Sequence, residues 1–451
     1  MALLHKGIYH GIQLLRGRPT VAYMHKLAQW DALEAHAYAA LCERRLARAL
    51  EHAKRHVPLY STGPWRSLPD RAARDIRDWP VLERRVIGEE RDRLLTDAAG
   101  GWGRPSLHVR RSSGSTGAPV EVVWDSRAMA WSWAAEYHPM RWHGLGIGVK
   151  TLRIWGSAKR LENWVLNRRF VRTDALTTEE LDKAYRYLVQ ERPTLVWGVP
   201  SAVAQLARYV AQRPAERRLV PFAKVGGEQV YEFQREEIRR GLGARVIEAY
   251  GCTEVGPIAA ECPLGSMHVL ATNVLVEVFR GDEPLPVGEH GDLVLTTLVN
   301  RGMPLVRCRV GDSGRLSPER CACGLPLPVL TDLRGRNADM LLAVDGTPVH
   351  GSALGQALHR YRDKPPLARV RQILFEQMDE RRWTIQVESE DGIEKDTLSR
   401  QVTELLQETF GSGCSAEIRV VPTIPREPSG KYRYYRAAHA VHGSRDQRVM
   451  H

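Results

Sequence analysis

Long hydrophobic runs are missing from this sequence of 451 residues. No stretch approaches the roughly 18–20 apolar residues that a membrane-spanning helix requires, so a transmembrane protein is excluded. Residues 1–18 mix His, Lys, Gln and Arg with apolar side chains and have neither the apolar core nor the cleavage site of a signal peptide. We therefore expect a cytoplasmic protein, with peripheral membrane attachment through a basic N-terminal segment left open.

Cysteine is scarce as well. Seven cysteines are too few and too unevenly placed for a disulfide framework, and five of them fall between residues 252 and 323. In a cytosolic chain such a cluster favours metal binding or simple burial. Cys262, His268, Cys321 and Cys323 offer three thiolates and one imidazole, a donor set that zinc binds tetrahedrally. A structural zinc site is expected there; the alternative is four unrelated residues.

Charge is not segregated along the chain. The 65 Lys and Arg exceed the 53 Asp and Glu, which gives a net charge of +12. The basic residues occur in short scattered groups such as Arg44-Arg45 and Arg239-Arg240, and no zinc-finger or RNA-recognition signature is present. The sequence therefore argues against nucleic-acid binding and favours anionic small molecules such as nucleotides and thioester carriers.

Internal repeats are also absent, and the pattern of the chain changes twice instead. Up to residue 266, strands alternate with helices, which predicts an α/β core with parallel pairing. The expected strands are 120–124, 150–155, 194–197, 222–225 and 244–248, and the expected helices are 128–143, 178–190, 200–211 and 232–240.

After Met267 the chain is rich in β-forming residues separated by Gly and Pro turns, which predicts a small β subdomain over about residues 267–335. Past Arg336 a β-β-α-β run predicts a separate α+β domain. We therefore expect an α/β protein with an N-terminal domain over residues 1–335 and a C-terminal domain over residues 336–451.

Residues 111–119, Arg-Ser-Ser-Gly-Ser-Thr-Gly-Ala-Pro, form a hydroxyl-rich, glycine-punctuated stretch between apolar runs. Glycine allows successive N–H groups to point into one concavity, which suits the oxygens of a polyphosphate. The stretch is not a Walker A loop, because no Lys follows Gly117. Taken alone, it is equally compatible with a flexible surface turn.

Four further motifs follow along the chain. Residues 249–254, Ala-Tyr-Gly-Cys-Thr-Glu, come directly after an expected strand, at the edge where open α/β sheets bind ligands. There Glu254 can ligate Mg²⁺ and Thr253 can donate to a phosphate. The others are Arg-Val-Gly-Asp at 309–312, Arg-Gly-Arg-Asn-Ala-Asp at 334–339 and Pro-Ser-Gly-Lys at 428–431. Each alone is compatible with an ordinary turn.

Together and in this order, the five motifs resemble those of the adenylate-forming (acyl-CoA synthetase) superfamily, most closely its phenylacetate–CoA ligase branch with its capsule-biosynthesis relatives. The resemblance extends from about residue 30 to 436 and includes the stretches 52–60, 197–206 and 226–228. It implies a large adenylating domain, a small mobile C-terminal lid and a two-step reaction. A carboxylic acid and ATP form an acyl-adenylate, and a thiol then displaces AMP.

The resemblance also implies how ATP and Mg²⁺ are held. Thr253 would contact the α-phosphate and Glu254 would bind Mg²⁺. Lys431 would bridge carboxylate and phosphate during adenylation, and Asp339 would be the hinge of the lid. The β- and γ-phosphates would be held by Ser112, Ser113, Gly114, Ser115, Thr116 and Gly117.

For the nucleoside, the resemblance implies that Gly227 and Glu228 border the adenine while Tyr250 stacks nearby and Gly251 keeps its backbone close to the ligand. Asp312 would bind the ribose hydroxyls and Arg336 would contact ribose or phosphate. The acyl pocket is harder to read, and the candidate lining residues, or alternatively core aromatics, are Tyr137, His138, Trp155 and Trp197.

Several points stay open at this level. Cys252 occupies a variable position, Cys308 stands where an aromatic residue is frequent, and both are interpreted as small buried side chains.

The acceptor of the acyl group is expected to be CoA, with a carrier-protein phosphopantetheine or an amine or hydroxyl as alternatives. A non-catalytic nucleotide-binding paralogue is disfavoured by the intact Glu254, Asp312 and Lys431. A homodimer is left open.

Overall fold

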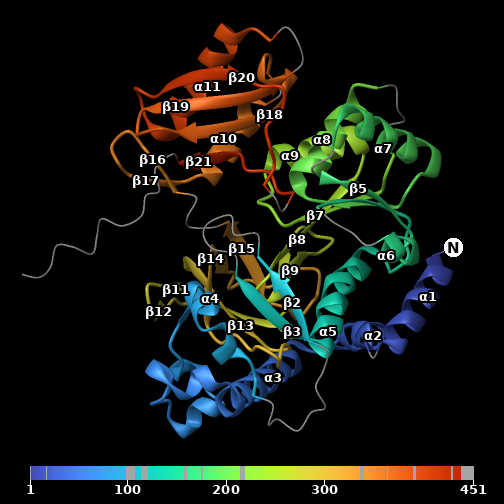
Figure 1. Ribbon diagram of the computed structural model, residues 1–451, viewed down its shortest axis with the longest axis vertical. Helices are drawn as coiled ribbons and strands as arrows, with labels where there is room; N and C mark the ends of the chain where they lie inside the picture. Colours follow the sequence, from blue (N-terminus) through green and yellow to red (C-terminus); the bar gives the residue numbers. More distant parts are fainter. Residues whose placement is uncertain are drawn as a thin grey trace, which may run out of the picture.

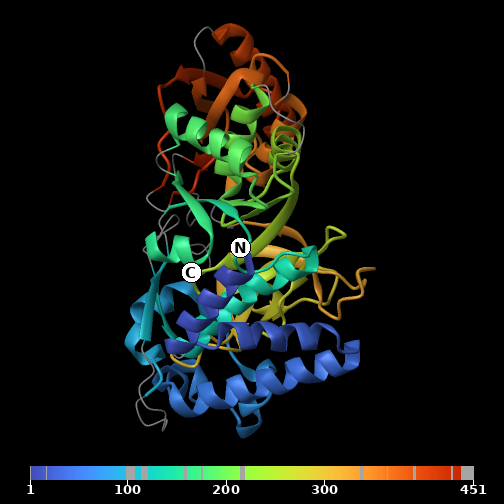
Figure 2. The ribbon, with the colours of Figure 1, turned by 90° about the vertical axis from the view of Figure 1, so that its right-hand side faces the viewer.

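The computed structural model has a large body and a smaller C-terminal part stacked along one long axis (Figure 1). It describes residues 2–16, 18–97, 107–112, 120–156, 160–173, 176–213, 219–335, 340–362, 364–389, 393–427 and 430–437. The view at right angles shows the N-terminal helices at the opposite end of the body from the C-terminal part (Figure 2). No helix among these residues is long and apolar enough to cross a bilayer.

A thirteen-stranded sheet runs through the body. Its parallel section joins β5, β4, β6, β7 and β8 in that order, so the expected parallel α/β core is confirmed. These strands are β4 (Thr151–Trp155), β5 (Arg168–Arg172), β6 (Leu195–Gly198), β7 (Phe222–Gly226) and β8 (Arg245–Cys252). Helices between them are α6 (Arg160–Val165), α7 (Thr178–Glu191), α8 (Pro200–Ala211) and α9 (Glu232–Leu242).

The strands that follow β8 continue the same hydrogen-bonded sheet. After β8 the chain turns back at once, and β9 (Gly256–Glu261) pairs antiparallel with it. The β-rich region expected after Met267 is present, and β9 and β10 join its strands to the parallel core in one sheet. The remaining strands are β10 (Met267–Val269), β11 (Val274–Arg280), β12 (Glu283–Pro284), β13 (His290–Thr297), β14 (Cys308–Leu316) and β15 (Val329–Arg334).

The N-terminal third covers this body with helices and one hairpin. The helix expected over 128–143 is shorter: α5 ends at Tyr137, and Pro139 starts a 3-10 segment over His138–His143. The elements are α1 (Ala2–Leu15), α2 (Thr20–Asp31), α3 (Ala35–His56), β1 (Leu82–Glu83), α4 (Arg84–Glu89), β2 (Leu107–Arg111), β3 (Glu121–Asp125) and α5 (Ser126–Tyr137). Further 3-10 segments are Pro58–Ser61, Gly63–Trp65, Asp70–Ala73, Ile76–Asp78 and Arg91–Leu94.

The C-terminal part contains a four-stranded sheet in the order β20-β19-β18-β21. The expected β-β-α-β run is present, whereas the small hairpin, α10 and β21 were not anticipated. The elements are β16 (Met340–Leu342), β17 (Pro348–His350), α10 (Ser352–Tyr361), β18 (Val370–Gln377), β19 (Arg382–Ser389), α11 (Lys395–Phe410), β20 (Ser415–Val420) and β21 (Tyr435–Ala437), with a 3-10 segment at Leu367–Arg369. The boundary at 335/336 borders residues outside the described part and stays a prediction.

The C-terminal part docks on the body through α9. Tyr231 and Phe233, at the start of α9, belong to the same buried cluster as the C-terminal core. Tyr231 lies so close to Gly355 of α10 that a Cβ there would meet its ring at 2.0 Å. Glu237 accepts from Arg362 Nε at 3.1 Å and from Arg208 Nη1 at 2.5 Å. Apolar packing and a buried ion pair therefore hold the two parts together.

Asp125 links α5 to the loop before β14 and offers a test of the fold. Its Oδ1 accepts the N–H groups of Arg127 and Ala128, each at 2.8 Å, and its Oδ2 accepts that of Arg301 at 3.1 Å. Replacing a capping carboxylate leaves such donors unsatisfied, so we expect Asp125→Ala to lower the free energy of unfolding by about 1–2 kcal/mol. Urea denaturation measures the loss.

The exposed Asp92, which forms an ion pair with its neighbour Arg91, provides the matched control. Asp92→Ala should leave the urea midpoint nearly unchanged because exposed ion pairs contribute little. Equal losses in the two variants would contradict the capping role of Asp125.

Candidate active site

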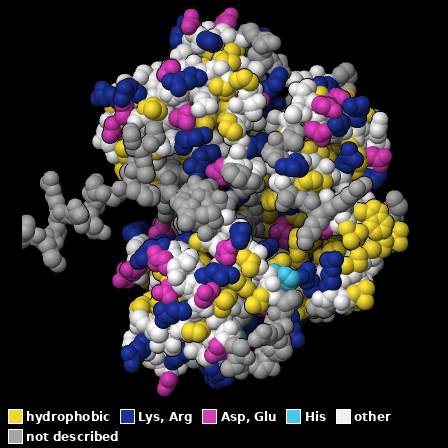
Figure 3. Space-filling view, in the orientation of Figure 1, with side chains coloured by type: hydrophobic (Ala, Val, Ile, Leu, Met, Phe, Trp, Pro, Cys, Tyr) yellow, Lys and Arg dark blue, Asp and Glu magenta, His cyan; other side chains and the backbone are white. Residues whose placement is uncertain are grey.

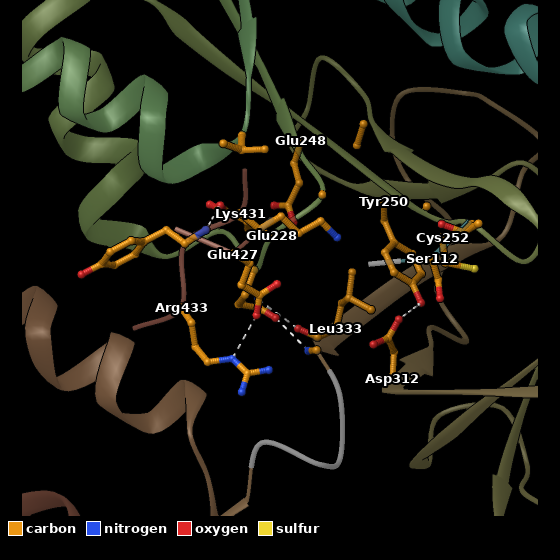
Figure 4. Close-up of a pocket in the computed structure, with 18 of the residues that line it drawn as sticks. Ser112, Glu228, Glu248, Tyr250, Cys252, Asp312, Leu333, Glu427, Lys431 and Arg433 are labelled. Atoms are coloured by element: carbon orange, nitrogen blue, oxygen red, sulfur yellow. Dashed lines mark hydrogen bonds and ion pairs between the residues drawn. The ribbon is translucent and has the colours of Figure 1, made fainter. Parts of the chain in front are cut away.

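A cavity of about 590 Å³ lies where the carboxyl ends of the parallel strands meet the loop around Lys431 (Figure 4). Its size is typical of a small-molecule site. Its walls include residues from β4, β8, β14 and β15, from the segment directly after β7 and from the C-terminal segment. They include Ser112, Trp155, Gly227, Glu228, Tyr250, Gly251, Thr253, Glu254, Asp312, Leu333, Gly335, Glu427, Lys431 and Tyr432.

Nine of the residues that the motifs predicted for the nucleotide site line this one cavity: Ser112, Gly227, Glu228, Tyr250, Gly251, Thr253, Glu254, Asp312 and Lys431. Figure 4 shows Tyr250 and Asp312 on one side, with Glu228 and Lys431 on the other. Seven predicted residues lie outside the described part of the chain, namely Ser113, Gly114, Ser115, Thr116, Gly117, Arg336 and Asp339.

The ends of the hydroxyl-rich loop are nonetheless placed. Strands β2 and β3 pair antiparallel up to Arg111 and Glu121. Ser112 then donates its N–H to the Val120 carbonyl at 2.9 Å, and its Oγ accepts from Val120 N–H at 2.9 Å. Because Arg111 and Ser112 line the cavity, the loop leaves and re-enters the hairpin at the cavity mouth.

Tyr250 and Asp312 join the end of β8 to β14. The Tyr250 hydroxyl donates to Asp312 Oδ2 at 2.7 Å. Burial and then the Asp312 carboxylate raise the pKa of Tyr250, so the phenol stays protonated and keeps donating. Gly311 has φ +87, the left-handed turn that presents Asp312 to the cavity. One carboxylate oxygen is thereby oriented by the phenol.

Arg84, which the motifs did not reveal, connects two predicted positions. Its Nε donates to Glu254 Oε1 at 2.8 Å and its Nη2 to Ser112 Oγ at 3.0 Å. The Glu254 side chain is 6% exposed, so this ion pair is screened little by water. Arg84 begins the six-residue helix α4, and nothing in its local sequence distinguishes it from the other arginines. Only the fold brings it to Glu254, 170 positions away.

Glu228, expected to border the adenine, lines the cavity and also binds the chain next to Lys431. Its Oε1 accepts the N–H of Tyr432 at 2.6 Å and the Ser201 hydroxyl at 3.0 Å, and its Oε2 accepts the Ser201 N–H at 3.0 Å. Arg426 also donates to Ser201 Oγ at 2.8 Å. A single carboxylate therefore ties the residue directly after Lys431 to the N-terminus of α8.

Lys431 reaches the body at Gly227. This glycine has φ +86, and a Cβ on it would lie 3.2 Å from Trp155 Cη2 and 3.9 Å from Lys431 Cε.

Of the four aromatic candidates for an acyl pocket, Trp155 lines the cavity. His138 does not: it is buried and contacts Asp31 Oδ2 at 2.7 Å, on α2.

The predicted metal ligands come together away from this cavity. The donor atoms of Cys262, His268, Cys321 and Cys323 all lie within 4.8 Å of one another. The sulfurs of Cys262 and Cys321 are 3.8 Å apart, far beyond a disulfide bond but equal to the edge of a tetrahedron with Zn–S bonds of about 2.3 Å. His268 Nδ1 lies 3.2 Å from the Leu327 carbonyl, which leaves Nε2 for a ligand. The geometry fits zinc.

Two further cysteines lie near the site. Cys308 is buried in the main core cluster as expected, whereas Cys252 is half-buried and lines the cavity. Burial raises the pKa of both thiols, which disfavours the thiolate form. On the face of the molecule drawn in Figure 3, Lys and Arg side chains are interspersed with Asp and Glu side chains.

Comparison with known proteins gives two family matches. Residues 112–298 match the model of the AMP-binding enzyme family, and residues 343–437 match the CapK C-terminal domain. The phenylacetate–coenzyme A ligase of Thermus thermophilus is 31% identical over 333 residues, covering 67% of this chain and 71% of that protein. The chain belongs to the phenylacetate–CoA ligase branch of the adenylate-forming enzymes. The Escherichia coli enzyme of the same name is 25% identical, covering 72% of this chain and 77% of its own.

Solved structures agree on the fold of this family. A 2-hydroxyisobutyryl-CoA ligase with a bound acyl-AMP superimposes with a TM-score of 0.74, at 17% identity and with 91% of each chain covered. The anthranilate CoA ligase AuaEII in complex with anthranoyl-AMP gives a TM-score of 0.52, at 16% identity, with 74% of this chain and 67% of that chain covered. At such identities the likeness concerns the fold alone.

The contact between Glu228 and the Lys431 loop can be tested without substrate. In Glu228→Gln the acceptor of the Tyr432 N–H becomes neutral and weaker, so this amide should exchange with deuterium about tenfold faster. Hydrogen exchange read by mass spectrometry on peptides covering residue 432 measures the change. Glu232→Gln, at an exposed position of α9, is the matched control and should leave exchange there unaltered. Unchanged protection in Glu228→Gln would contradict the proposed anchoring.

Proposed function

We propose that this protein is an AMP-forming ligase that activates a carboxylic acid with ATP and transfers the acyl group to CoA. The observation that carries the proposal is the meeting of Lys431 with Glu254, Tyr250 and Asp312 around one cavity, although Lys431 is far from the other three in the chain. The curated relatives named phenylacetate–coenzyme A ligase support both half-reactions.

In the first half-reaction, an oxygen of the substrate carboxylate attacks the α-phosphorus of ATP. The bond from that phosphorus to the bridging oxygen breaks, and pyrophosphate leaves. We assign Lys431 to the cleft between carboxylate and phosphate, where its ammonium offsets the repulsion of two anions. Asp312 would hold the ribose hydroxyls, oriented by Tyr250. In the second half-reaction, the CoA sulfur attacks the acyl carbon, AMP departs and the thiol proton goes to solvent.

Glu254 and Arg84 suit the triphosphate end of ATP. Glu254 offers a buried carboxylate of the kind that shares Mg²⁺ with substrate phosphates, and when bound, Mg²⁺ would neutralise charge on those phosphates. Arg84 already spans Glu254 and Ser112, so its guanidinium lies between the proposed magnesium ligand and the phosphate-binding loop. We assign Arg84 to the binding of the phosphates, which arginine contacts with its planar fork.

We assign Cys262, His268, Cys321 and Cys323 to a structural zinc site. The four ligands leave no open position for substrate, as is typical of structural zinc. The ligands come from β10 and the turns after β9 and before β15, so the metal would crosslink the strands that continue the parallel core.

The acceptor of the acyl group is the least constrained part of the proposal. A carrier-protein phosphopantetheine, or an amine or hydroxyl, would use the same adenylation chemistry. CoA is favoured because the relatives' names specify it. A cytoplasmic location and a homodimer stay predictions from the sequence.

Lys431→Ala should lower acid-dependent pyrophosphate release by at least about a hundredfold, because it removes the charge between two anions. Formation of the CoA thioester from a chemically prepared acyl-adenylate should persist. Pyrophosphate release is measured with ATP·Mg²⁺ over a panel of aryl, fatty, hydroxy and dicarboxylic acids. Lys395→Ala, at an exposed position of α11, controls for loss of a lysine in the same domain. Unchanged pyrophosphate release in Lys431→Ala would refute its role.

For zinc, protein purified without a metal-affinity tag should contain about one zinc per chain by elemental analysis. Cys321→Ser should lose most of this metal and melt at a lower temperature, since metal binding contributes directly to folding stability. Cys42→Ser, outside the cluster, should retain zinc. Only a substoichiometric trace in the unmodified protein would end the zinc proposal.

A further inference from the structure

Positive charge gathers on one face of the parallel sheet, beneath α5. The register places Arg153 of β4 beside Trp197 of β6, and Trp197 beside Lys224 of β7. Side chains at matched positions of neighbouring parallel strands point to the same face, so these three form a continuous row. Tyr137 of α5 packs on Trp197 with ring centroids 5.8 Å apart. The row is thus enclosed between sheet and helix.

Lys224 has a partner in this enclosure. Its side chain is 3% exposed, and Nζ lies 2.5 Å from Glu136 Oε1 and 2.8 Å from the Glu136 carbonyl oxygen. Desolvation lowers the pKa of Lys224, while the Glu136 carboxylate opposes that effect. Glu136 is therefore committed to Lys224 and is not available as the sole counter-ion of a second cation.

Arg153 has no such partner among the residues that the structure describes. Its guanidinium carbon lies 4.3 Å from the ring centroid of Trp155 and 3.9 Å from that of Trp197, and Nη1 is buried without a hydrogen-bond acceptor among the described residues. Desolvation, followed by the charge of Arg168, lowers the pKa of Arg153 to about 9. Even so, Arg153 remains a cation at neutral pH. Two indole faces partly stabilise it but satisfy none of its N–H donors.

The neighbouring Arg168 adds to the excess of positive charge. It donates to the Tyr137 hydroxyl, and its Nη1 is 3.9 Å from the half-exposed Glu162. Among the described residues, the region therefore contains three cations, one closely paired carboxylate and one distant carboxylate. A buried charge without a counter-ion is unfavourable, so a protein that keeps one is suited to receive an anion there.

The row formed by Arg153, Trp197 and Lys224 lies next to the proposed active site. Trp155 follows Arg153 by two residues on the same face of β4, and it borders the cavity beside Gly227 and Lys431. Arg153 and Trp155 are both half-buried, so part of each side chain stays accessible. Successive positions on one face of a strand lie about 7 Å apart.

We propose that Arg153 forms a subsite for a second anionic group of the acyl substrate, so that the enzyme prefers a dicarboxylic acid to the matching monocarboxylic acid. One carboxylate would react near Lys431, and the other would accept the N–H groups of Arg153 on the far side of Trp155. The inference rests on the proposed ligase function and deepens it. A carboxylate is favoured over larger oxyanions because two tryptophan rings confine the guanidinium.

The test measures pyrophosphate release for pairs of acids of equal length: hexanoate and adipate, and phenylacetate and its para-carboxy derivative. An ω-phosphono analogue of hexanoate separates a phosphonate from a carboxylate. The unmodified enzyme should favour each dicarboxylate in kcat/KM. Arg153→Met preserves side-chain length between the two indoles and removes the charge, so the preference should fall by about 10- to 100-fold, mainly through KM.

A second readout is independent of catalysis. The dicarboxylate alone should raise the melting temperature of the unmodified protein and not that of Arg153→Met. Without ligand, Arg153→Met should melt no lower than the unmodified protein, because an unpaired buried charge has been removed. Arg169→Met, at an exposed neighbouring arginine on β5, is the matched control and should behave as the unmodified protein. Arg153→Lys, which keeps the charge, should retain an intermediate preference and replaces the Met variant if that variant does not fold.

The outcomes separate this subsite from the ligase proposal. Activation of monocarboxylates with no dicarboxylate preference, or a preference that Arg153→Met leaves intact, would overturn the subsite alone. A stronger response to the phosphonate would overturn the assignment to carboxylates. If no acid releases pyrophosphate, the ligase function fails, and the melting experiment still decides the subsite: a shift that depends on Arg153 supports it, and no shift overturns it.

Discussion

The carboxylate of Glu228 joins the body of this protein to its C-terminal part at the candidate active site. It accepts hydrogen bonds from the N-terminus of α8 and from the amide next to Lys431, so the body and the C-terminal segment share one charged acceptor. Hydrogen bonds to a charged acceptor are about twice as strong as neutral ones. The cavity depends on this contact, because Lys431 closes the side opposite Tyr250 and Asp312. The ion pair of Arg362 with Glu237 and the packing of Tyr231 support the same arrangement from behind.

The site as a whole is organised around anions. Arg84 lies between Glu254 and Ser112, Lys431 lies at Gly227, and Arg153 lies beyond Trp155. These three cations come from the N-terminal third, the C-terminus and the parallel sheet. In a poorly solvated cavity their fields are screened weakly. Such an arrangement suits a triphosphate, a carboxylate and, on our inference, a second carboxylate.

Much of the architecture could be predicted from local pattern. The alternation of strands and helices before residue 266 predicted the parallel core, and the order of five motifs predicted the family. One expected bound was wrong, and one connection was not specified by the local pattern. Pro139 ended α5 earlier than its apolar pattern suggested. The β-rich region proved continuous with the core because β9 pairs with β8, a register that no local signal specifies. Glu228 was expected beside adenine, and its anchoring of the Lys431 loop became visible only in the folded chain.

The sequence by itself determined the family, the α/β class, the set of nucleotide-site candidates and the four metal-ligand candidates, because these depend on residue types in a fixed order. The tertiary structure decided which distant side chains meet. The pairing of Arg84 with Glu254, the contact of Glu228 with Tyr432 and the row of Arg153, Trp197 and Lys224 join positions far apart in the chain. The physical reason is that strand register and domain docking set these distances through long-range packing, and a linear pattern carries no measure of either.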